Sequence, residues 1–438
     1  MKMKRQAMSF LKSWKEKKNR KPLIIKGARQ VGKTWLMKEF GRTYFENVCY
    51  INFDNNQRME RVFEMDYDVP RILQALEIES GLKISPENTL IIFDEIQEVP
   101  KALTSLKYFN EKASEHFIIA AGSQLGVSLH KGVSFPVGKI EFLNLYPLNF
   151  IEFLEATGNP QLTDLITKSD FDMIRAFKDR YIELLKQYYF VGGMPEAVAS
   201  FIQDDDFNGV REIQQNLLAL YEMDFSKHAP IQQVPRIRMI WNSIITQLSK
   251  ENRKFIYGVI REGARAKDFE LAIQWLNDCG LIYKVQRIKE PRLPVKAYAD
   301  LKSFKIFLLD VGLLNAMGAV DVKTILDGND VFMEFKGALT EQYVLQQLIS
   351  QCHLEPYYYT EIKSSGEIDF IVQKESSIIP IEVKAAENLK AKSLRAYCEK
   401  YKPQMAVRTS LSDFRRESWL INIPLYAISV LNEIGLLK

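Results

Sequence analysis

The sequence is poor in the features that mark secreted, membrane-spanning or disulfide-stabilised proteins. It has four cysteines in 438 residues, and none forms a C-x-x-C pair. This spacing argues against a disulfide framework and against a zinc ribbon. The apolar runs are strand-sized, far short of the roughly 18 residues that a membrane-spanning helix needs. The basic N-terminus lacks the apolar segment of a signal peptide, so we expect a cytoplasmic protein without membrane contact.

The chain also has little excess charge of either sign. Its 59 Lys and Arg residues face 55 Asp and Glu residues, which gives a formal net charge of +4. Composition alone therefore does not indicate a nucleic-acid-binding protein. Residues 1–22 are an exception, because Glu16 is the only acid among many lysines and arginines there. Two interpretations remain open: this segment contacts phosphates or an acidic partner, or it is a solvated helix before the first strand.

What the sequence does contain is a regular alternation of strand and helix patterns. Hydrophobic residues make up 47% and charged residues 26%, as in ordinary globular proteins. Helical patterns such as Arg71–Glu79 and Lys101–Ala113 separate the strand-like runs. Four apolar runs read as strands, at 22–26, 48–53, 89–93 and 117–121. This alternation predicts an α/β fold with a parallel sheet covered on both faces.

The pattern changes along the chain, which predicts a multi-domain protein. The parallel-sheet region covers 1–155 and is followed by a helical region at 156–234. Residues 235–295 read in part as helix, turn, helix and strand, which is typical of a winged helix. Residues 296–438 return to an α/β pattern. We therefore expect four regions with these bounds.

A phosphate-binding loop is the strongest motif. Residues 27–34 fit G-x-x-x-x-G-K-[ST] between a strand and a helix. Backbone N–H groups of such a loop point at phosphates, and the following helix adds its dipole. Lys33 would place its charge on the β- and γ-phosphates, and the Thr34 hydroxyl would bind Mg²⁺, so we expect ATP and magnesium as cofactors. The predicted nucleotide-contacting residues are Gly27, Ala28, Arg29, Gln30, Val31, Gly32, Lys33, Thr34 and Trp35.

Two acids follow the buried strand Leu90–Phe93 and complete this site. Asp94 is predicted to support the magnesium ion, and Glu95 to polarise the attacking water. An acid in the second position favours hydrolysis over the phosphoryl transfer of a P-loop kinase. Ser123 follows the fourth strand, where its hydroxyl either senses the γ-phosphate or belongs to a simple turn.

These motifs, together with Tyr146-Pro147-Leu148 and the segment 192–196, resemble the uncharacterised prokaryotic AAA-type ATPases. Members pair an additional-strand P-loop core with a C-terminal domain of unknown function, and the resemblance covers almost the whole chain. It implies ATP binding, an AAA-like core at 1–155 and a helical lid at 156–234. Lys139 stands where members often carry an arginine, and it keeps the charge without the planar fork. The residues that carry over by position are Gly32, Lys33 and Thr34 for phosphate and Mg²⁺, Asp94 for the metal, Glu95 for water activation and Ser123 as a sensor.

A second group of charged residues lies on two predicted strands near the C-terminus. The runs 367–372 and 379–384 alternate in polarity with the period of a strand. If a two-residue turn falls at 375–376, Asp369 lies directly opposite Glu382. Facing like charges destabilise a sheet, whereas a divalent cation bound by both carboxylates would stabilise it. Glu341 lies on the apolar face of the predicted helix 337–350, where a carboxylate needs a partner or a metal.

A helix Glu, a strand Asp and a Glu-x-Lys segment together resemble the PD-(D/E)XK nuclease fold. The resemblance implies that Asp369 and Glu382 hold Mg²⁺, with Glu341 as an accessory ligand. Lys384 would act on the nucleophilic water or on the charge of the transition state. Two alternatives remain: a solvated hairpin face with one Glu–Lys pair, and a nuclease-like fold that no longer cuts.

The winged-helix pattern is a poor candidate for reading a DNA sequence. Its second helix, 268–278, presents mainly acids, whereas base edges are read by Arg, Lys, Asn or Gln. Arg253, Lys254, Arg261 and Arg265 are nevertheless available for sequence-independent phosphate contacts. We therefore expect this region mainly to connect its neighbours.

The leading hypothesis is a Mg²⁺-dependent ATPase that couples its nucleotide state to a nuclease-like C-terminal domain acting on DNA or RNA. The alternative is a nucleotide-dependent switch whose inactive C-terminal domain binds a protein partner. The modest net charge favours this alternative. Both hypotheses are compatible with an oligomer.

Overall fold

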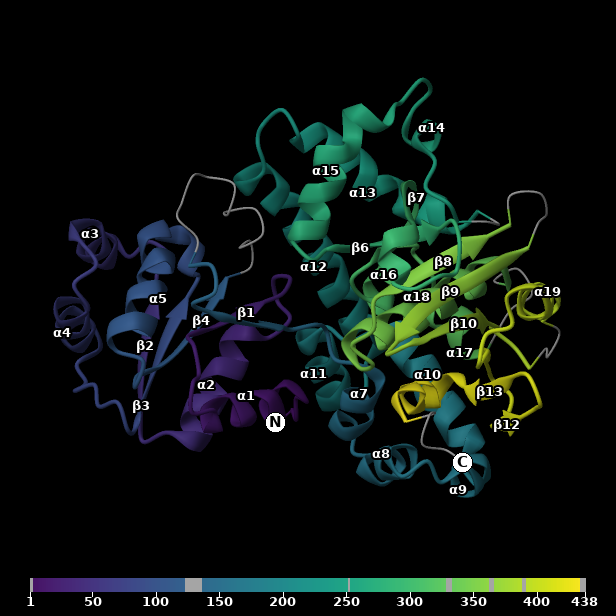
Figure 1. The fold of residues 1–438 in the computed structure, drawn as a ribbon, viewed down its shortest axis with the longest axis horizontal. Helices are drawn as coiled ribbons and strands as arrows, with labels where there is room; N and C mark the ends of the chain where they lie inside the picture. Colours follow the sequence, from purple (N-terminus) through teal and green to yellow (C-terminus); the bar gives the residue numbers. More distant parts are fainter. Residues whose placement is uncertain are drawn as a thin grey trace. The chain divides into compact units, whose positions relative to one another are not determined.

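The computed structural model describes residues 3–122, 136–250, 253–327, 333–361, 366–387 and 391–433 (Figure 1). The chain forms two compact units. The smaller contains Lys4–Tyr146 and Asp278–Gly280, and the larger consists chiefly of Pro147–Asn277 and Leu281–Lys438. Each unit is built around its own sheet.

The sheet of the smaller unit has five parallel strands in the order β2-β3-β4-β1-β5. Strand β4 lies between β1 and β3, which is the additional-strand arrangement that the resemblance implies. Strands β3 and β4 are buried along their whole length, in keeping with their unbroken apolar sequence. The four predicted strands are confirmed. The strands are β1 (Leu23–Lys26), β2 (Asn47–Asn52), β3 (Thr89–Asp94), β4 (Phe117–Gly122) and β5 (Glu141–Asn144).

Helices cover this sheet, and their ends follow from capping residues. The side chain of Asn56 accepts a hydrogen bond from the backbone at the start of α3, and Asp68 does the same for α4. A core beside β2 and β3 contains Phe53, Phe63 and Phe93, whose rings meet edge to face. The helices are α1 (Ala7–Glu16), α2 (Lys33–Tyr44), α3 (Gln57–Met65), α4 (Val69–Ser80) and α5 (Pro100–Lys112), with a 3₁₀ turn η1 (Ile96–Glu98).

The larger unit begins with helices, as the apolar period of residues 161–250 predicts. Further helices follow between its strands. Before the first strand come α7 (Phe150–Ala156), α8 (Pro160–Thr167), α9 (Phe171–Ala176), α10 (Lys178–Val191), α11 (Pro195–Asp204), α12 (Phe207–His228), α13 (Val234–Leu248), α14 (Tyr257–Ile260) and α15 (Ala266–Asp278). Later in the chain come α16 (Val311–Met317), α17 (Val322–Asp327), α18 (Met333–Ser350) and α19 (Lys392–Tyr401). The helical segment predicted as a lid thus belongs to the same compact unit as the C-terminal α/β region.

The second sheet has eight strands in the order β12-β13-β11-β10-β9-β8-β6-β7. Strand β6 pairs antiparallel with β7 and parallel with β8. The expected boundary between residues 295 and 296 therefore falls inside a pair of neighbouring strands, and the strand of the expected winged helix belongs to the C-terminal sheet. The elements are β6 (Ile282–Ile288), η2 (Val295–Tyr298), β7 (Ala299–Leu308), β8 (Pro356–Thr360), β9 (Glu367–Lys374), β10 (Ser377–Val383), β11 (Val407–Ser410), β12 (Arg415–Arg416), β13 (Ile421–Pro424) and η4 (Leu425–Asn432).

Three buried glutamines of α18 hold the larger unit together. The side-chain amide of Gln342 donates to the Leu308 carbonyl at 2.6 Å and accepts from the Leu308 N–H at 2.9 Å, at the end of β7. Gln347 Oε1 accepts from the Phe150 N–H at 2.9 Å, at the start of α7. Gln346 donates to Asp310 Oδ2 at 3.1 Å. Because buried backbone groups need partners, these amides fix the helical segment against the sheet.

Asp310 is the centre of this joint. Its Oδ2 accepts a 2.7 Å hydrogen bond from the Gly193 N–H, and its Oδ1 accepts from the Leu313 N–H at 3.1 Å. Burial raises the pKa of the Asp310 carboxyl, and these backbone hydrogen bonds oppose the rise. The Gly-Gly-Met-Pro-Glu segment at 192–196 therefore serves as an attachment point between α10, α11 and α16.

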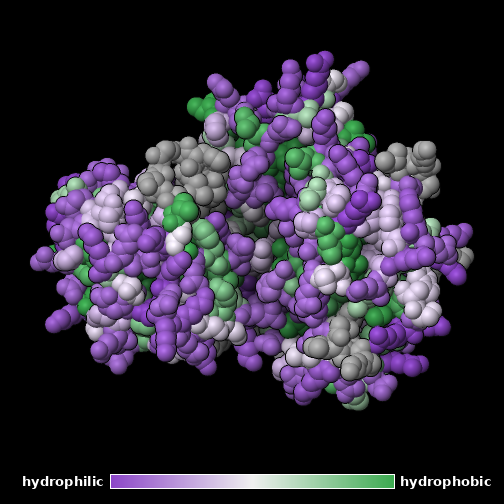
Figure 2. Space-filling view, in the orientation of Figure 1, coloured by the Kyte–Doolittle hydropathy of each residue, from purple (hydrophilic) through white to green (hydrophobic). Residues whose placement is uncertain are grey.

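Figure 2 shows a predominantly hydrophilic face with separate hydrophobic spots. Within the described residues, the helices lack the combination of length and apolar composition that crossing a membrane requires.

Candidate nucleotide site and C-terminal carboxylate cluster

The phosphate loop between β1 and α2 has the curled backbone that its glycines predict. Gly27, Gln30 and Gly32 have φ angles of 157°, 65° and 93°. A side chain at Gly27 would place its Cβ only 2.2 Å from the Leu145 carbonyl oxygen, so this position requires glycine. The loop ends at Gly32, which is the N-cap of α2, so the positive end of the helix dipole lies at the loop.

Lys33 is folded into this loop. Its ammonium group donates to the carbonyl oxygens of Gly27 at 2.9 Å and Ala28 at 2.7 Å, and the residue is 7% exposed. Burial lowers the pKa of Lys33 to about 8, while the charges of Glu95 and Asp94 oppose this shift. A buried ammonium held by loop carbonyls can exchange them for phosphate oxygens, to which it makes stronger charge-assisted hydrogen bonds.

Asp94 connects the end of β3 to the phosphate loop. Its Oδ2 accepts hydrogen bonds from Thr34 Oγ1 at 2.7 Å and from the Tyr50 hydroxyl at 2.9 Å. Its Oδ1 accepts from the Glu95 N–H at 3.1 Å. Sequence reasoning missed Tyr50, because a tyrosine in a half-buried strand is ordinary and nothing in its spacing marks it. A hydroxyl and a carboxylate in direct contact are oxygen donors of the kind that Mg²⁺ prefers, so the residues present fit a magnesium nucleotide.

The other residues predicted for this site have fewer contacts that bear on their roles. Glu95 accepts a 2.6 Å hydrogen bond from Gln97 Nε2 and has a φ angle of 51°, so it begins the η1 turn. Trp35 is 38% exposed on α2. Lys139 pairs with Glu111 on α5 at 3.0 Å. Ser123 lies outside the described residues, so its role as a sensor stays a prediction.

The basic N-terminal segment packs on the same unit. Helix α1 buries Leu11 and Trp14, and the Trp14 indole donates to the Lys21 carbonyl at 2.8 Å. Arg5 is 7% exposed and donates to the carbonyls of Val31 at 3.0 Å and Tyr146 at 2.6 Å. The segment is therefore not simply a solvated helix. Arg5 supports the phosphate loop through the Val31 carbonyl. Sequence reasoning missed Arg5, since it is one of many basic residues in the segment.

In the larger unit, the predicted register of β9 and β10 is confirmed. Ser377 pairs with Lys374 across the turn, and the ladder continues to Ile381 opposite Phe370. Asp369 and Glu382 come next in this register, beyond the last paired residues. The Val383 N–H donates to Asp369 Oδ2 at 2.7 Å, which fixes the aspartate at this end of the ladder.

Glu382 is buried beside this aspartate. Burial and the charge of Asp369 raise the pKa of Glu382 to about 7, and the pairing of Glu382 with Lys384 at 2.6 Å opposes the rise. Glu382 Oε2 has no hydrogen-bond partner among the described residues. The structure thus brings Asp369, Glu382 and Lys384 together as the sequence predicts.

Glu341 joins this group from α18, but two cations accompany it. Its Oε1 pairs with Arg253 Nη1, and its Oε2 lies 3.6 Å from the Lys305 ammonium. Lys305 is fully buried on β7 and also pairs with Glu367. Arg253 was predicted to be available for phosphate contacts, but its guanidinium pairs with Glu341. A lysine inside the apolar run 304–309 was a sequence signal for Lys305, whereas nothing in the sequence marked Arg253 as a partner of Glu341.

These carboxylates and cations do not form a ready-made divalent site. In the part of the chain that the structure describes, no group of three or more His, Cys, Asp or Glu side chains is arranged to hold a metal ion. The positive charges that neutralise the carboxylates come instead from Arg253, Lys305 and Lys384. The magnesium role of Glu341, Asp369 and Glu382 therefore stays a prediction.

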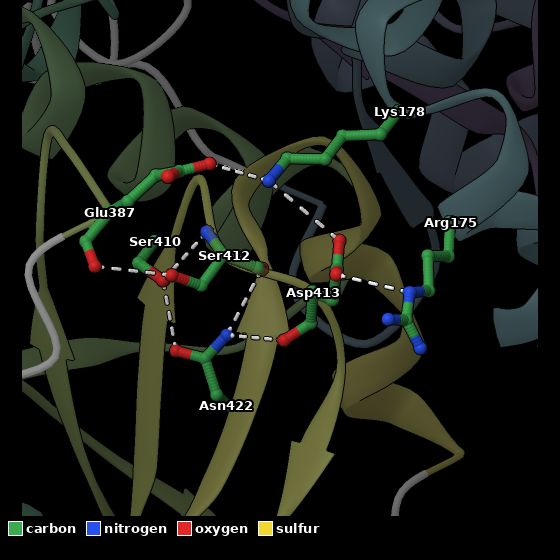
Figure 3. A network of polar contacts seen from close by, with 7 residues as sticks. All are labelled: Arg175, Lys178, Glu387, Ser410, Ser412, Asp413 and Asn422. Atoms are coloured by element: carbon green, nitrogen blue, oxygen red, sulfur yellow. Dashed lines mark hydrogen bonds and ion pairs between the residues drawn. The ribbon is translucent and has the colours of Figure 1, made fainter.

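A second polar network joins helices α9 and α10 to the loops of this sheet (Figure 3). Lys178 lies 2.5 Å from Glu387, which follows the strand of Glu382, and 3.8 Å from Asp413. Arg175 pairs with Asp413 at 3.3 Å. The Asn422 side-chain amide donates to the carbonyls of Ser412 and Asp413 and holds the loop in place. The loop after β10 is thus tied to the helical segment.

Comparison with known proteins separates the N-terminal part of the chain from the rest, as the division into two compact units does. Residues 19–154 match a family described as an AAA domain. The match and the five-stranded parallel sheet support an AAA-type P-loop ATPase core. Similarity to this class of protein supports nucleotide binding and hydrolysis in general terms. Residues 182–324 and 336–427 match two families described as domains of unknown function (DUF8612 and DUF4143), and the first spans the expected boundary at residue 295. No curated protein matches the chain.

Solved structures overlap the chain only loosely. The DNA complex of the Aeropyrum pernix Orc1 protein is 13% identical, with a TM-score of 0.26, covering 72% of this chain and 91% of that one. The Drosophila ORC bound to DNA is 12% identical, with a TM-score of 0.27, covering 72% and 94%. Caenorhabditis elegans PCH-2 is 10% identical, with a TM-score of 0.22, covering 63% and 66%. Scores this low do not establish a shared overall fold.

Proposed function

We propose that the N-terminal unit is a Mg²⁺-dependent ATP hydrolase. The hydrogen bond between Thr34 Oγ1 and Asp94 Oδ2 carries this proposal, because it aligns the two predicted magnesium residues. Bound magnesium would neutralise charge on the β- and γ-phosphates. Lys33 binds the same phosphates, and Glu95 orients the attacking water and accepts its proton.

ATP turnover by two variants tests these roles. Lys33→Ala removes the charge that holds the phosphates, so both binding and hydrolysis should be lost. Glu95→Gln keeps the shape of the side chain and removes the base, so ATP binding should persist while hydrolysis falls at least 100-fold, by the usual size of general-base contributions (roughly 10²–10⁴). Retained hydrolysis in Glu95→Gln would remove the assignment of Glu95.

For the larger unit, the favoured function is a nuclease-like activity on DNA or RNA that depends on the nucleotide state. The observation that supports it is the meeting of Asp369, Glu382 and Lys384 at one end of β9 and β10. Lys384, whose side chain is 31% exposed beside Glu382, is a cation from which sequence-independent phosphate contacts could extend. Helix α10 holds the loop after β10 through the pairing of Lys178 with Glu387, which offers a route for coupling.

Cleavage of mixed DNA and RNA with Mg²⁺, in the presence and absence of ATP, tests this function. The Asp369→Ala/Lys384→Ala double variant is the control. Cleavage by the wild type that the double variant loses would support the assignment. No cleavage of any substrate with intact ATP turnover would contradict it.

A nucleotide-dependent switch without cleavage is the second candidate function. The pairing of Arg253 and Lys305 with the carboxylates favours it, because buried ion pairs neutralise the cluster without metal. On this alternative the larger unit binds a protein partner. Binding of nucleic acid by phosphate contacts weakens steeply with salt, so a salt titration of DNA binding separates the two candidates.

A further inference from the structure

Arg253 is one of the cations of the carboxylate cluster. It follows α13, and its guanidinium pairs with Glu341, while the side chain is only 15% exposed. The negative charges of Asp369 and Glu367 also act on it. One positive side chain thus serves carboxylates from both α18 and β9.

The surrounding structure makes room for this arginine. A Cβ added at Gly337, in α18, would lie 2.9 Å from Arg253 Nη2, so this glycine leaves the space that the guanidinium fills. Arg253 itself has a φ angle of 47°, a left-handed conformation that costs a non-glycine residue about 1–3 kcal/mol. The chain is fixed just beyond it, where the Phe255 N–H donates to the Phe304 carbonyl at 2.8 Å.

Even with Arg253 in place, the cluster has unused acceptor capacity. Glu341 and Glu382 are 5% and 6% exposed, and one Oε2 atom of each has no hydrogen-bond partner among the residues that the structure describes. Lys305 lies 3.6 Å from the Glu341 oxygen, beyond hydrogen-bond distance. Buried carboxylate oxygens without a hydrogen-bond partner are costly, and a directly bound cation would satisfy them.

We propose that Arg253 is an internal counter-ion that keeps divalent cations out of the cluster of Glu341, Asp369 and Glu382. A divalent cation enters only when Arg253 releases Glu341. The choice of a divalent cation as the species that competes with Arg253 for the carboxylates rests on the proposed function of the larger unit. A guanidinium paired with a carboxylate occupies the oxygen that a metal ion would bind, and its charge repels a second cation.

Binding of Mn²⁺ to the nucleotide-free full chain, measured by calorimetry, tests this gate. Arg253→Gln should bind Mn²⁺ at least about tenfold more tightly than the wild type, because one nearby positive charge is removed. Gly337→Ala should shift binding in the same direction, since its methyl group displaces the guanidinium while alanine favours the helix. Arg261→Gln, which changes an exposed arginine of the neighbouring segment, should have no effect.

The outcomes separate the gate from the metal site itself. A gain that Asp369→Asn abolishes in the Arg253→Gln background supports the gate. If the wild type and Arg253→Gln bind Mn²⁺ with equal affinity, and Asp369→Asn abolishes binding in both, the gate is overturned and the proposed metal site stands. No Mn²⁺ binding by any variant overturns both.

Thermal unfolding provides the second measurement, in case the variant folds poorly. Arg253→Gln leaves the Glu341 carboxylate without its arginine, so its melting temperature should fall in EDTA and recover with Mn²⁺. A wild-type melting temperature that responds to Mn²⁺ as strongly as that of the variant would also contradict the gate.

Discussion

Tyr50 and Thr34, from different elements of the N-terminal unit, donate hydrogen bonds to the same oxygen of Asp94, at 2.9 and 2.7 Å. If Thr34 offered an oxygen lone pair to a metal, its proton would remain available to Asp94, and Tyr50 would hold the same carboxylate oxygen from a second element. The Tyr50 hydroxyl is held protonated, because burial and the neighbouring charge of Asp94 raise its pKa far above the usual value. It therefore acts as a permanent donor.

Replacing Tyr50 by phenylalanine should weaken the response to magnesium. The ring keeps its packing, but Asp94 loses one donor, a change of about 1 kcal/mol or more to a charged acceptor. We expect the Mg²⁺ concentration for half-maximal ATPase activity to rise several-fold, with metal-free nucleotide binding unchanged. Tyr108→Phe on α5 is the matched control. An unchanged magnesium dependence would show that Tyr50 does not position Asp94.

Replacing Arg5 by alanine should loosen the phosphate loop. Arg5 holds the Val31 carbonyl, one residue before Gly32, so its loss leaves a buried backbone oxygen without this partner. We expect ATP affinity to fall several-fold, measured with a fluorescent nucleotide, and unfolding to begin at a lower temperature. Lys12→Ala, an exposed position on α1, should change neither value. Wild-type affinity in Arg5→Ala would mean that Arg5 supports only the fold.

Binding of ATP should take up a proton at alkaline pH. The pKa of Lys33 in the free protein is lowered to about 8 by burial, and bound phosphates stabilise its charged form. Affinity should therefore fall as the pH rises through 8. Calorimetry at pH 8.5 in two buffers with different ionisation enthalpies measures the uptake directly. Lys33→Arg, whose charge does not titrate in this range, should bind without it, and identical heats for the wild type would contradict the expectation.

Glu382 should make the larger unit less stable as the pH rises from about 4.5 to 7. Its pKa is raised from 4.5 to about 7 in the folded chain, so in this range the folded state keeps a proton that the unfolded state has lost. Stability then falls with rising pH, by on the order of 3 kcal/mol for this group. Glu382→Gln should remove that decline in urea unfolding followed from pH 4.5 to 8. The same slope in wild type and Glu382→Gln would assign the effect elsewhere; Glu290→Gln, at an exposed position, is the control.

Local patterns in the sequence predicted the fold of the N-terminal unit well. Strands β1 to β4 are apolar runs with helices between them, and the phosphate loop has a backbone that few sequences can adopt. Strand β5 was missed, because its four residues alternate between half-buried and exposed positions at the edge of the sheet. The register of β9 and β10 was predictable since a two-residue turn fixes every pair that follows.

Long-range pairing could not be predicted in this way. Nothing local to β6 indicates that it lies between β7 and β8, so the boundary at residue 295 was placed between two paired strands. Arg253 and Glu341 are 88 positions apart and meet only through the tertiary fold. Tyr50 and Arg5 likewise act through atoms of distant residues, and no pattern of residue types marks such contacts.

The pairing of β6 with β7, and the glutamines of α18, limit how the gene can be divided. A fragment that starts at residue 296 would lose β6 and leave the edges of β7 and β8 open, which favours aggregation of the expressed product. It would also remove the Phe150 and Gly193 N–H groups, the partners of Gln347 and Asp310. Most of the smaller unit ends at Tyr146, so a division there separates neither β6 from β7 nor α18 from its partners. The helical segment and the C-terminal sheet must be inherited as a single module.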